Sequence, residues 1–240
     1  MRRMTPYMQF LVESMAAEAD EKNAVQMAAY MRDQFPFLGI KSPERRQVLS
    51  AFLKEAGMPD GEDMAGVARV LWDLPEREYQ YSAIDILRRG QKRLGPAFVS
   101  DLEWLITTKS WWDTVDGLAG WIAGAIFSAY PEVGAEAVGR WRSQENIWLR
   151  RTTLLYQLHY KERTDAPLLF SLIEQNLADS EFFIQKAVGW ALREYSKTDE
   201  TAVRDFVART QLSPLAAREA LKWLNNQARK AESRNPAADS

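Results

Sequence analysis

The sequence predicts an all-α fold, a curved solenoid of stacked helical hairpins, and three observations lead to this class. Apolar residues recur with helical periodicity through almost the whole chain. Strand signals such as Asn-Gly hairpin turns and long alternations of apolar and polar residues are nearly absent. Segments with a matching apolar pattern recur 35 residues apart, a period typical of proteins built from pairs of helices.

The helix starts are predicted from capping residues. The first helix is expected within MRRMTPYMQFLVESMAAEAD (1–20), because Gln and Glu interrupt what would otherwise be the apolar part of a signal peptide. Ser42 and Ser213 are each followed by proline, which predicts a hydroxyl N-cap and proline at the first helical position. Asp179 or Ser180 is expected to cap the helix that follows in 181–197.

Turn-forming segments then divide the chain into about a dozen helices joined by short loops. We expect one domain over residues 1–230, with residues 231–240 as a flexible tail. The breaks are FPFLGIKSP (35–43), AGMPDGED (56–63), DLPERE (73–78), RLGP (93–96), YPEVG (130–134), KERTDAP (161–167) and QLSP (211–214).

The 35-residue repeat predicts which side chains share a surface. RRTTLLYQL (150–158) matches QKAVGWALR (185–193) after one step and QYSAIDILR (80–88) after two steps in the other direction. Equivalent positions of successive repeats point the same way. Steps of 35 from one acid in the centre of the chain therefore place four polar side chains along one concave face, namely Tyr81, Asp116, Arg151 and Lys186.

Composition excludes several classes of site. The chain has no cysteine and one histidine, His159, so a disulfide framework, a thiolate or histidine metal site and a Ser-His triad are not expected. We expect no metal and no cofactor, and any chemistry has to come from carboxylates, aromatics and cations. The net charge of −2 gives no global basic footprint. With no long apolar run, the protein is expected to be cytoplasmic.

Two helices carry chemistry-bearing residues beside a core stripe. The segment 109–126 buries a stripe of Trp111, Val115, Leu118, Ile122 and Ile126. The neighbouring stripe is predicted to leave the backbone open to close approach, and it consists of Trp112, Asp116, Gly120 and Ala123. In segment 181–197 the core stripe is Ile184, Val188, Ala191 and Tyr195. A cationic stripe with a tryptophan lies beside it, formed by Lys186, Trp190, Arg193 and Lys197.

Plainer interpretations stay open for these residues. A lone helical tryptophan usually packs against a core, and Asp116 and Arg151 could be members of surface ion pairs. The cations of RRGQKR (88–93) suit an exposed helix end, although they could also hold a phosphate. His159 is interpreted as a packing or surface residue.

Five segments together resemble the AlkD family of bacterial DNA alkylation repair enzymes. The resemblance runs in order over nearly the whole chain and implies a right-handed solenoid of HEAT-like repeats whose concave, cationic face holds double-stranded DNA. It also implies a DNA glycosylase for N3- and N7-alkylated purines that leaves the damaged base stacked. The segments are FLGIKSPERR (37–46), LWDLPEREYQ (71–80), KSWWDTVD (109–116), NIWLRR (146–151) and FFIQKAVGWALREY (182–195).

The resemblance also implies roles for single residues. The family's catalytic aspartate falls on Asp116 and its active-site tryptophans on Trp112 and Trp190. Its phosphate-contacting arginine falls on Arg151. Other residues of the groove are expected to bind DNA as well, namely Tyr30, Arg193, Lys186 and Arg46.

Cationic alkylpurines suit a site with one essential carboxylate. The alkylated base leaves as a neutral molecule without a proton from a general acid, and an anion can stabilise the oxocarbenium ion that develops on the sugar. We therefore expect a monomeric, monofunctional glycosylase. Two alternatives remain, a protein-binding helical scaffold in which Trp112 and Trp190 are interface anchors, and a DNA-damage binder without catalysis.

Overall fold

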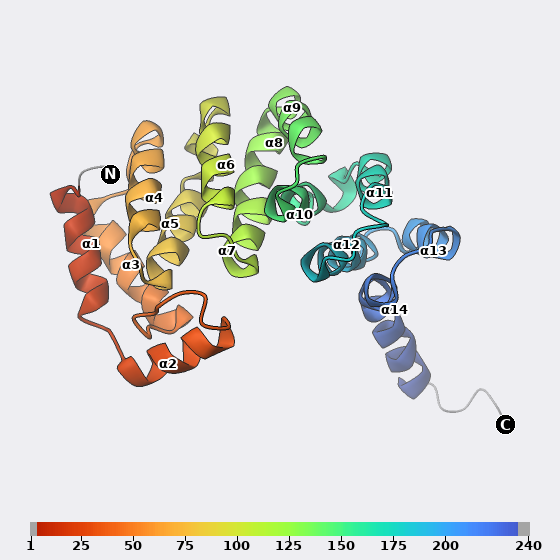
Figure 1. The fold of residues 1–240 in the computed structure, drawn as a ribbon, viewed down its shortest axis with the longest axis horizontal. Coiled ribbons are helices and arrows are strands. Elements are labelled where there is room, and N and C mark those ends of the chain that lie inside the picture. Colours follow the sequence, from red (N-terminus) through yellow and green to blue (C-terminus); the bar gives the residue numbers. More distant parts are fainter. Residues whose placement is uncertain (1–3, 235–240) are drawn as a thin grey trace. The chain divides into compact units, whose positions relative to one another are not determined.

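The structure is a computed structural model that describes residues 4–234. Every regular element in that range is helical, which confirms the all-α class. The chain divides into two compact units, Met1–Leu118 and Ala119–Ser240. Figure 1 shows both units as successions of packed helices. Among the described helices none is long and apolar enough to cross a bilayer.

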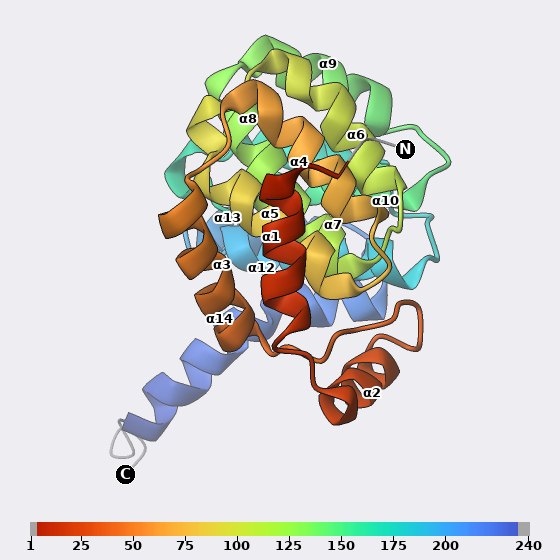
Figure 2. The same cartoon turned by 90° about the vertical axis from the view of Figure 1, so that its left-hand side faces the viewer.

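Unit 1 is a stack of helices with one helix set apart. The pairs α1 and α3, α3 and α5, α4 and α5, α4 and α6, and α5 and α7 pack against each other. In Figures 1 and 2 α2 lies below this stack, beside the loop that leads to α3. The elements are α1 (Pro6–Ala16), α2 (Glu21–Tyr30), α3 (Ser42–Ala56), α4 (Gly61–Asp73), α5 (Arg77–Arg89), the short 3-10 helices η1 (Gln91–Arg93) and η2 (Pro96–Phe98), α6 (Val99–Thr107) and α7 (Trp112–Gly117).

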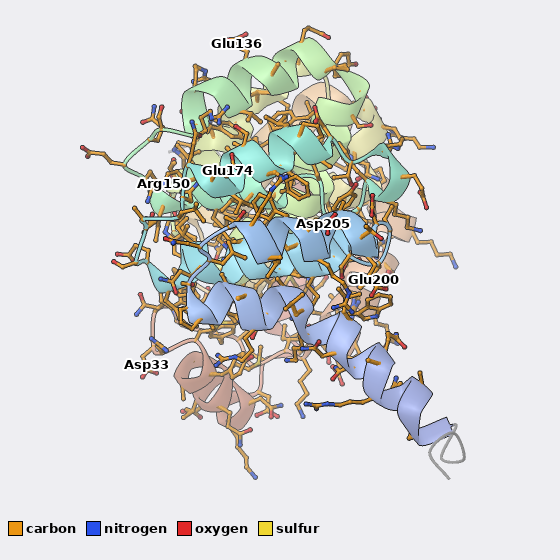
Figure 3. The ribbon with its side chains drawn as sticks, turned by 90° about the vertical axis from the view of Figure 1, so that its right-hand side faces the viewer. Asp33, Glu136, Arg150, Glu174, Glu200 and Asp205 are labelled. Carbon is orange, nitrogen blue, oxygen red and sulfur yellow. The ribbon has the colours of Figure 1, made fainter. Side chains whose placement is uncertain are left out.

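Unit 2 continues the pattern of paired helices. Its helix pairs α8 and α9, α10 and α11, α10 and α12, and α12 and α14 pack together. Figure 3 shows α13 and α14 in front, with Asp205 labelled on α13. The elements are η3, a π-helical segment that begins at the end of unit 1 (Leu118–Ala123), α8 (Gly124–Ala129), α9 (Pro131–Trp141), α10 (Ile147–Leu155), the 3-10 helix η4 (Lys161–Arg163), α11 (Ala166–Glu174), α12 (Phe182–Tyr195), α13 (Glu200–Arg209) and α14 (Pro214–Arg234).

The helix starts confirm the repeat of 35 residues. The first helix of each hairpin begins 35 residues after the one before it, at residues 42, 77, 112, 147 and 182 for α3, α5, α7, α10 and α12. The second elements keep the same spacing, with α4, η2, α9 and α11 beginning at residues 61, 96, 131 and 166. The backbone therefore repeats in register although few side chains do.

The helix caps differ in part from the prediction. Ser213 accepts the Ala216 N–H through its hydroxyl and caps α14 as predicted. Ser42 does not cap α3, because it is the first helical residue and the N-cap is Lys41, which makes no side-chain capping bond. The cap of α12 is Glu181, while the predicted Asp179 accepts the Glu181 N–H from outside the helix. A serine or aspartate near the start of a helix does not by itself determine which residue is the N-cap.

The two chain ends meet the sequence prediction in different ways. The helix α1 confirms the first helix expected within residues 1–20, and Thr5 caps it through its hydroxyl. At the other end α14 extends to Arg234, so residues 231–234 of the expected tail are helical. The remainder of that segment, 235–240, lies outside the described residues.

The predicted core stripes are largely buried. Val115, Leu118, Ile122 and Ile126 are buried as expected. Trp111 is an exception, because it is the N-cap of α7 in an extended conformation and stays partly exposed. In α12 the residues Ile184, Val188 and Ala191 are buried, while Tyr195 is partly exposed.

Candidate active site

The short helix α7 carries the first part of the predicted site in unit 1. Trp112 is its first residue and Asp116 follows one turn later, so both lie on one side of the helix. Both side chains are partly exposed. Thr114 and Val115 are completely buried between them in sequence and hold the opposite side of α7 in the core.

The other aspartate of this helix, Asp113, belongs to a buried ion pair. Arg77, at the start of α5, donates from Nε and Nη2 to the two oxygens of Asp113 at 2.9 and 2.7 Å. The side chain of Arg77 is 0% exposed and that of Asp113 5%. Tyr81 adds a third hydrogen bond, from its hydroxyl to Asp113 Oδ2 at 2.7 Å. Burial, followed by the charge of Asp113, raises the pKa of Tyr81, so its hydroxyl stays a donor.

Tyr30 meets Trp112 from α2. The two rings lie edge to face with their centroids 6.3 Å apart, and Tyr30 is 73% exposed. A pocket of about 390 Å³ opens beside this aromatic pair within unit 1. Its lining combines apolar, aromatic and charged side chains, namely Gln26, Met27, Tyr30, Met31, Phe37, Ser42, Arg45, Tyr81, Trp112 and Asp113.

Three residues of unit 1 that the sequence analysis singled out lie at equivalent positions of successive repeats. Arg46, Tyr81 and Asp116 are each the fifth residue of their helices, α3, α5 and α7. Arg46 is exposed and donates from Nε to the Ser42 carbonyl within its own helix. The hydroxyl of Tyr81, in contrast, donates a hydrogen bond to Asp113 on another helix.

Arg151 and Lys186 are likewise the fifth residues of α10 and α12 in unit 2. Arg151 is only 4% exposed, and its Nη1 donates to the carbonyl of Phe183 on α12. This predicted phosphate-contacting arginine therefore also joins two helices of its unit.

The predicted cationic stripe of α12 includes an acidic partner from α14. Lys186 and Arg193 bind the two carboxylate oxygens of Glu219, at 3.0 and 2.8 Å. The hydrogen bond from Lys186 is the largest cause that lowers the pKa of Glu219, and the charges of both cations add to it. Trp190 lies between these cations along the helix and is partly exposed. Lys197 pairs with Glu194, so every cation of this stripe has an acidic neighbour.

The small residues after Asp116 do not leave open space. A Cβ at Gly120 would lie 3.2 Å from His159 Nε2, and Ala123 is completely buried. The expectation that another molecule approaches the backbone there is wrong, because another part of unit 2 already fills the space. His159 stacks on Trp121 with ring centroids 3.7 Å apart, which confirms its interpretation as a packing residue at the surface.

Comparisons with known proteins identify the family of the chain. A family model described as DNA alkylation repair enzyme matches residues 11–224. The chain belongs to this family. It is also similar to a solved structure described as a predicted DNA alkylation repair enzyme from Enterococcus faecalis, with 36% identity and a TM-score of 0.80 over 86% of this chain and 96% of that one. A search of curated proteins finds no significant match.

Membership in the DNA alkylation repair enzyme family makes DNA repair the process in which the chain takes part and DNA its substrate class. The residues 4–234 gather no group of three or more metal-binding side chains of the His, Cys, Asp or Glu type.

Sequence reasoning missed the charged partners that hold the helices of this repair enzyme together. Arg77, Asp113 and Glu219 each bind a charged group on another helix, between 26 and 36 residues away in the chain. No local pattern in the sequence identifies the partner of a charged residue, because that partner depends on tertiary packing.

Proposed function

We propose that the chain is a monofunctional DNA glycosylase of the AlkD type, with HEAT-like repeats. It hydrolyses the N-glycosidic bond of N3- and N7-alkylated purines, such as 3-methyladenine and 7-methylguanine, in double-stranded DNA. The position of one acid beside an aromatic ring carries this proposal. Asp116 lies partly exposed one turn after Trp112, on the same side of α7.

In the proposed reaction the protein mainly supplies a negative charge close to the sugar. An alkylated purine is a cation, so cleavage of its glycosidic bond releases a neutral base, while positive charge grows on the deoxyribose. The carboxylate of Asp116 stabilises this charge and orients the attacking water. Hydrolysis of ordinary O-glycosides normally requires two carboxylates, one of them as an acid for the leaving group. One catalytic carboxylate is enough for an alkylated base, and water is the only co-substrate.

Aromatic faces complete the proposed site. Trp112 and Trp190 contact the deoxyribose and the cationic lesion, and each cation–π contact contributes about 0.5–2 kcal/mol. Tyr30 supports Trp112 through its edge-to-face contact. An open aromatic site of this kind engages the lesion while the base stays stacked in the duplex, in contrast to enzymes that extrude the base into a pocket.

Cations hold the phosphate backbone in this proposal. Arg151 contacts the phosphates next to the lesion, and Arg46, Lys186 and Arg193 add contacts along the duplex. A lyase step at the abasic product would need a neutral amine as nucleophile. Lys186 is the nearest candidate, and its ammonium is engaged with Glu219 at 3.0 Å. This pairing supports a monofunctional enzyme. The proposal also takes the protein to act as a monomer in the cytoplasm.

Single-turnover release of 7-methylguanine from a defined duplex tests the proposal. The wild type, Asp116→Asn and Asp205→Asn are compared at saturating enzyme. Asp205 is an exposed residue of α13, so its variant makes the same chemical change away from the proposed site (Figure 3). We expect at least about a hundredfold slower release for Asp116→Asn and an unchanged rate for Asp205→Asn.

The other outcomes identify the alternative functions. If no variant releases the base but DNA binding falls steeply with salt, the chain is a damage binder. If DNA does not bind, the chain is a protein-binding scaffold. If Asp116→Asn keeps the wild-type rate, the assignment of the catalytic acid is wrong even where base release is observed.

A further inference from the structure

The aromatic pair of Tyr30 and Trp112 depends on a helix that has almost no core of its own. No residue of α2 is buried, so this helix is not held by an apolar face. Contacts at its first turn therefore matter for its position. The start of α2 is tied to the loop before α3, because Asp20 donates its N–H to the Leu38 carbonyl at 2.8 Å.

This loop is held by one buried carboxylate. Glu78, in the first turn of α5, is 0% exposed. Its oxygens accept the backbone N–H groups of Leu38, Gly39 and Ile40 at 3.0, 2.8 and 3.1 Å. Three backbone donors on one ionised acceptor make a strong and directional clamp.

The loop also fits α2 closely. Gly39 has φ +89°, and a Cβ at this position would lie 1.9 Å from the Asp20 carbonyl oxygen. The clamp on Glu78 therefore sets the position of the first turn of α2 directly, with no side chain between the two backbones.

The preceding residue, Arg77, holds the other half of the aromatic pair. Beyond its ion pair with Asp113, it donates to the Lys109 carbonyl and to Thr114 Oγ1, both at 2.9 Å. These contacts fix the backbone on both sides of Trp112. The guanidinium also lies 3.8 Å over the ring of Phe35, and the Arg77 N–H donates to the Pro36 carbonyl at 2.9 Å.

We propose that Arg77 and Glu78 are positioning residues that set how Tyr30 lies against Trp112. Arg77 fixes the start of α7, which carries Trp112 and Asp116, and Glu78 fixes the loop that anchors α2. Two adjacent residues at one end of α5 thus control both partners of the pair. The effect on base release rests on the proposed glycosylase function, whereas the effect on geometry does not.

The rate of base release is the first measurement. Glu78→Gln keeps the size of the side chain but replaces one acceptor oxygen by an amide donor, and Arg77→Lys keeps the charge but loses the bidentate geometry. We expect each to slow single-turnover release about tenfold to a hundredfold, because small misplacements of catalytic groups have effects of this size. Saturating enzyme makes the rate constant insensitive to an unfolded fraction, so loss of stability alone does not reproduce the effect.

A matched control removes an ion pair elsewhere in unit 1. Arg69 on α4 pairs with Asp101 on α6 and contacts none of the residues of the aromatic pair. Arg69→Gln should lower the melting temperature and leave the single-turnover rate constant unchanged.

The second measurement reports geometry without activity. The nine tryptophans are labelled with 5-fluorotryptophan, and the fluorine resonance of Trp112 is assigned as the one missing from Trp112→Phe. In Glu78→Gln and Arg77→Lys this resonance should move toward its position in Tyr30→Leu, which lacks the neighbouring ring. In Arg69→Gln it should stay at its wild-type position.

The outcomes separate the two proposals. If both variants keep the wild-type rate constant and the wild-type Trp112 resonance, the positioning role is overturned and the residues only stabilise the fold. If the wild type releases no base while the resonance moves as described, the positioning role stands and the glycosylase function fails.

Discussion

Arg77 and Asp113 form a bidentate ion pair at 2.9 and 2.7 Å with both side chains almost fully buried. Removal of one partner from such a pair leaves the other charge buried and unmatched, which destabilises a protein by about 3–5 kcal/mol. Asp113→Asn should therefore lower the free energy of unfolding by about this amount. Urea denaturation followed by circular dichroism measures it.

Asp116→Asn is the comparison within the same helix. The Asp116 side chain is partly exposed, so its replacement should change the free energy of unfolding by less than about 1 kcal/mol. The same variant should lose base release. A large loss of stability with Asp116→Asn, and none with Asp113→Asn, would reverse the roles assigned to the two aspartates.

Arg151→Ala should weaken the fold as well as DNA binding and base release. Arg151 donates to the Phe183 carbonyl from a buried position, and a buried acceptor that loses its donor destabilises by about 1–3 kcal/mol. Thermal unfolding and DNA titration measure the two effects. Arg150→Ala is the control, because the neighbouring Arg150 pairs with Asp179 and is not part of the proposed site. It should leave base release unchanged, and equal losses in both variants would count against a DNA contact by Arg151.

Glu219 should make stability depend on pH at the acidic end. Its pKa in the folded protein is lowered below the ordinary value of 4.5, mainly by the hydrogen bond from Lys186. A lowered pKa in the folded state means that the stabilising contribution is fully present above pH 4.5 and is lost as the pH falls through the folded value. The melting temperature of the wild type should exceed that of Glu219→Gln most above pH 5. The difference should shrink toward pH 3, and one that grows on acidification would contradict the assignment.

Two glycines with similar φ angles give a test of the clamped loop. Gly39 and Gly57 have φ +89° and +81°, so alanine at either position is strained, by about 1–3 kcal/mol. Only at Gly39 does a Cβ also collide with backbone, whereas at Gly57 nothing lies within 4 Å. Gly39→Ala should therefore lower the melting temperature clearly more than Gly57→Ala. Equal effects would mean that the loop can move away from α2.

The sequence predicted the parts of this fold that depend on local pattern. The fold class, the 35-residue period and the buried residues Val115 and Ile184 follow from periodicity, which each helix carries in its own residues. The period also predicted the equivalent positions of Tyr81 and Asp116 in their helices.

The partners of charged residues could not be predicted in the same way. No local pattern shows that Asp113 binds Arg77, because this depends on which helix packs against which side of α7. The same holds for Glu219 and for the space beside Gly120, which His159 fills. The role of Asp116 in catalysis stays a prediction until base release is measured.

The helix starts keep a constant spacing, whereas the side chain at a given helix position varies from one hairpin to the next. One position, the fifth residue of the first helix in each hairpin, holds four kinds of side chain in five repeats while the spacing of the helix starts stays the same. Exchange of two residues between these equivalent positions would change the order of charged side chains along the chain but not the spacing of the helices. Deletion of one residue would instead rotate every later residue of its helix by about 100°. The residues at this fifth helix position are Arg46, Tyr81, Asp116, Arg151 and Lys186.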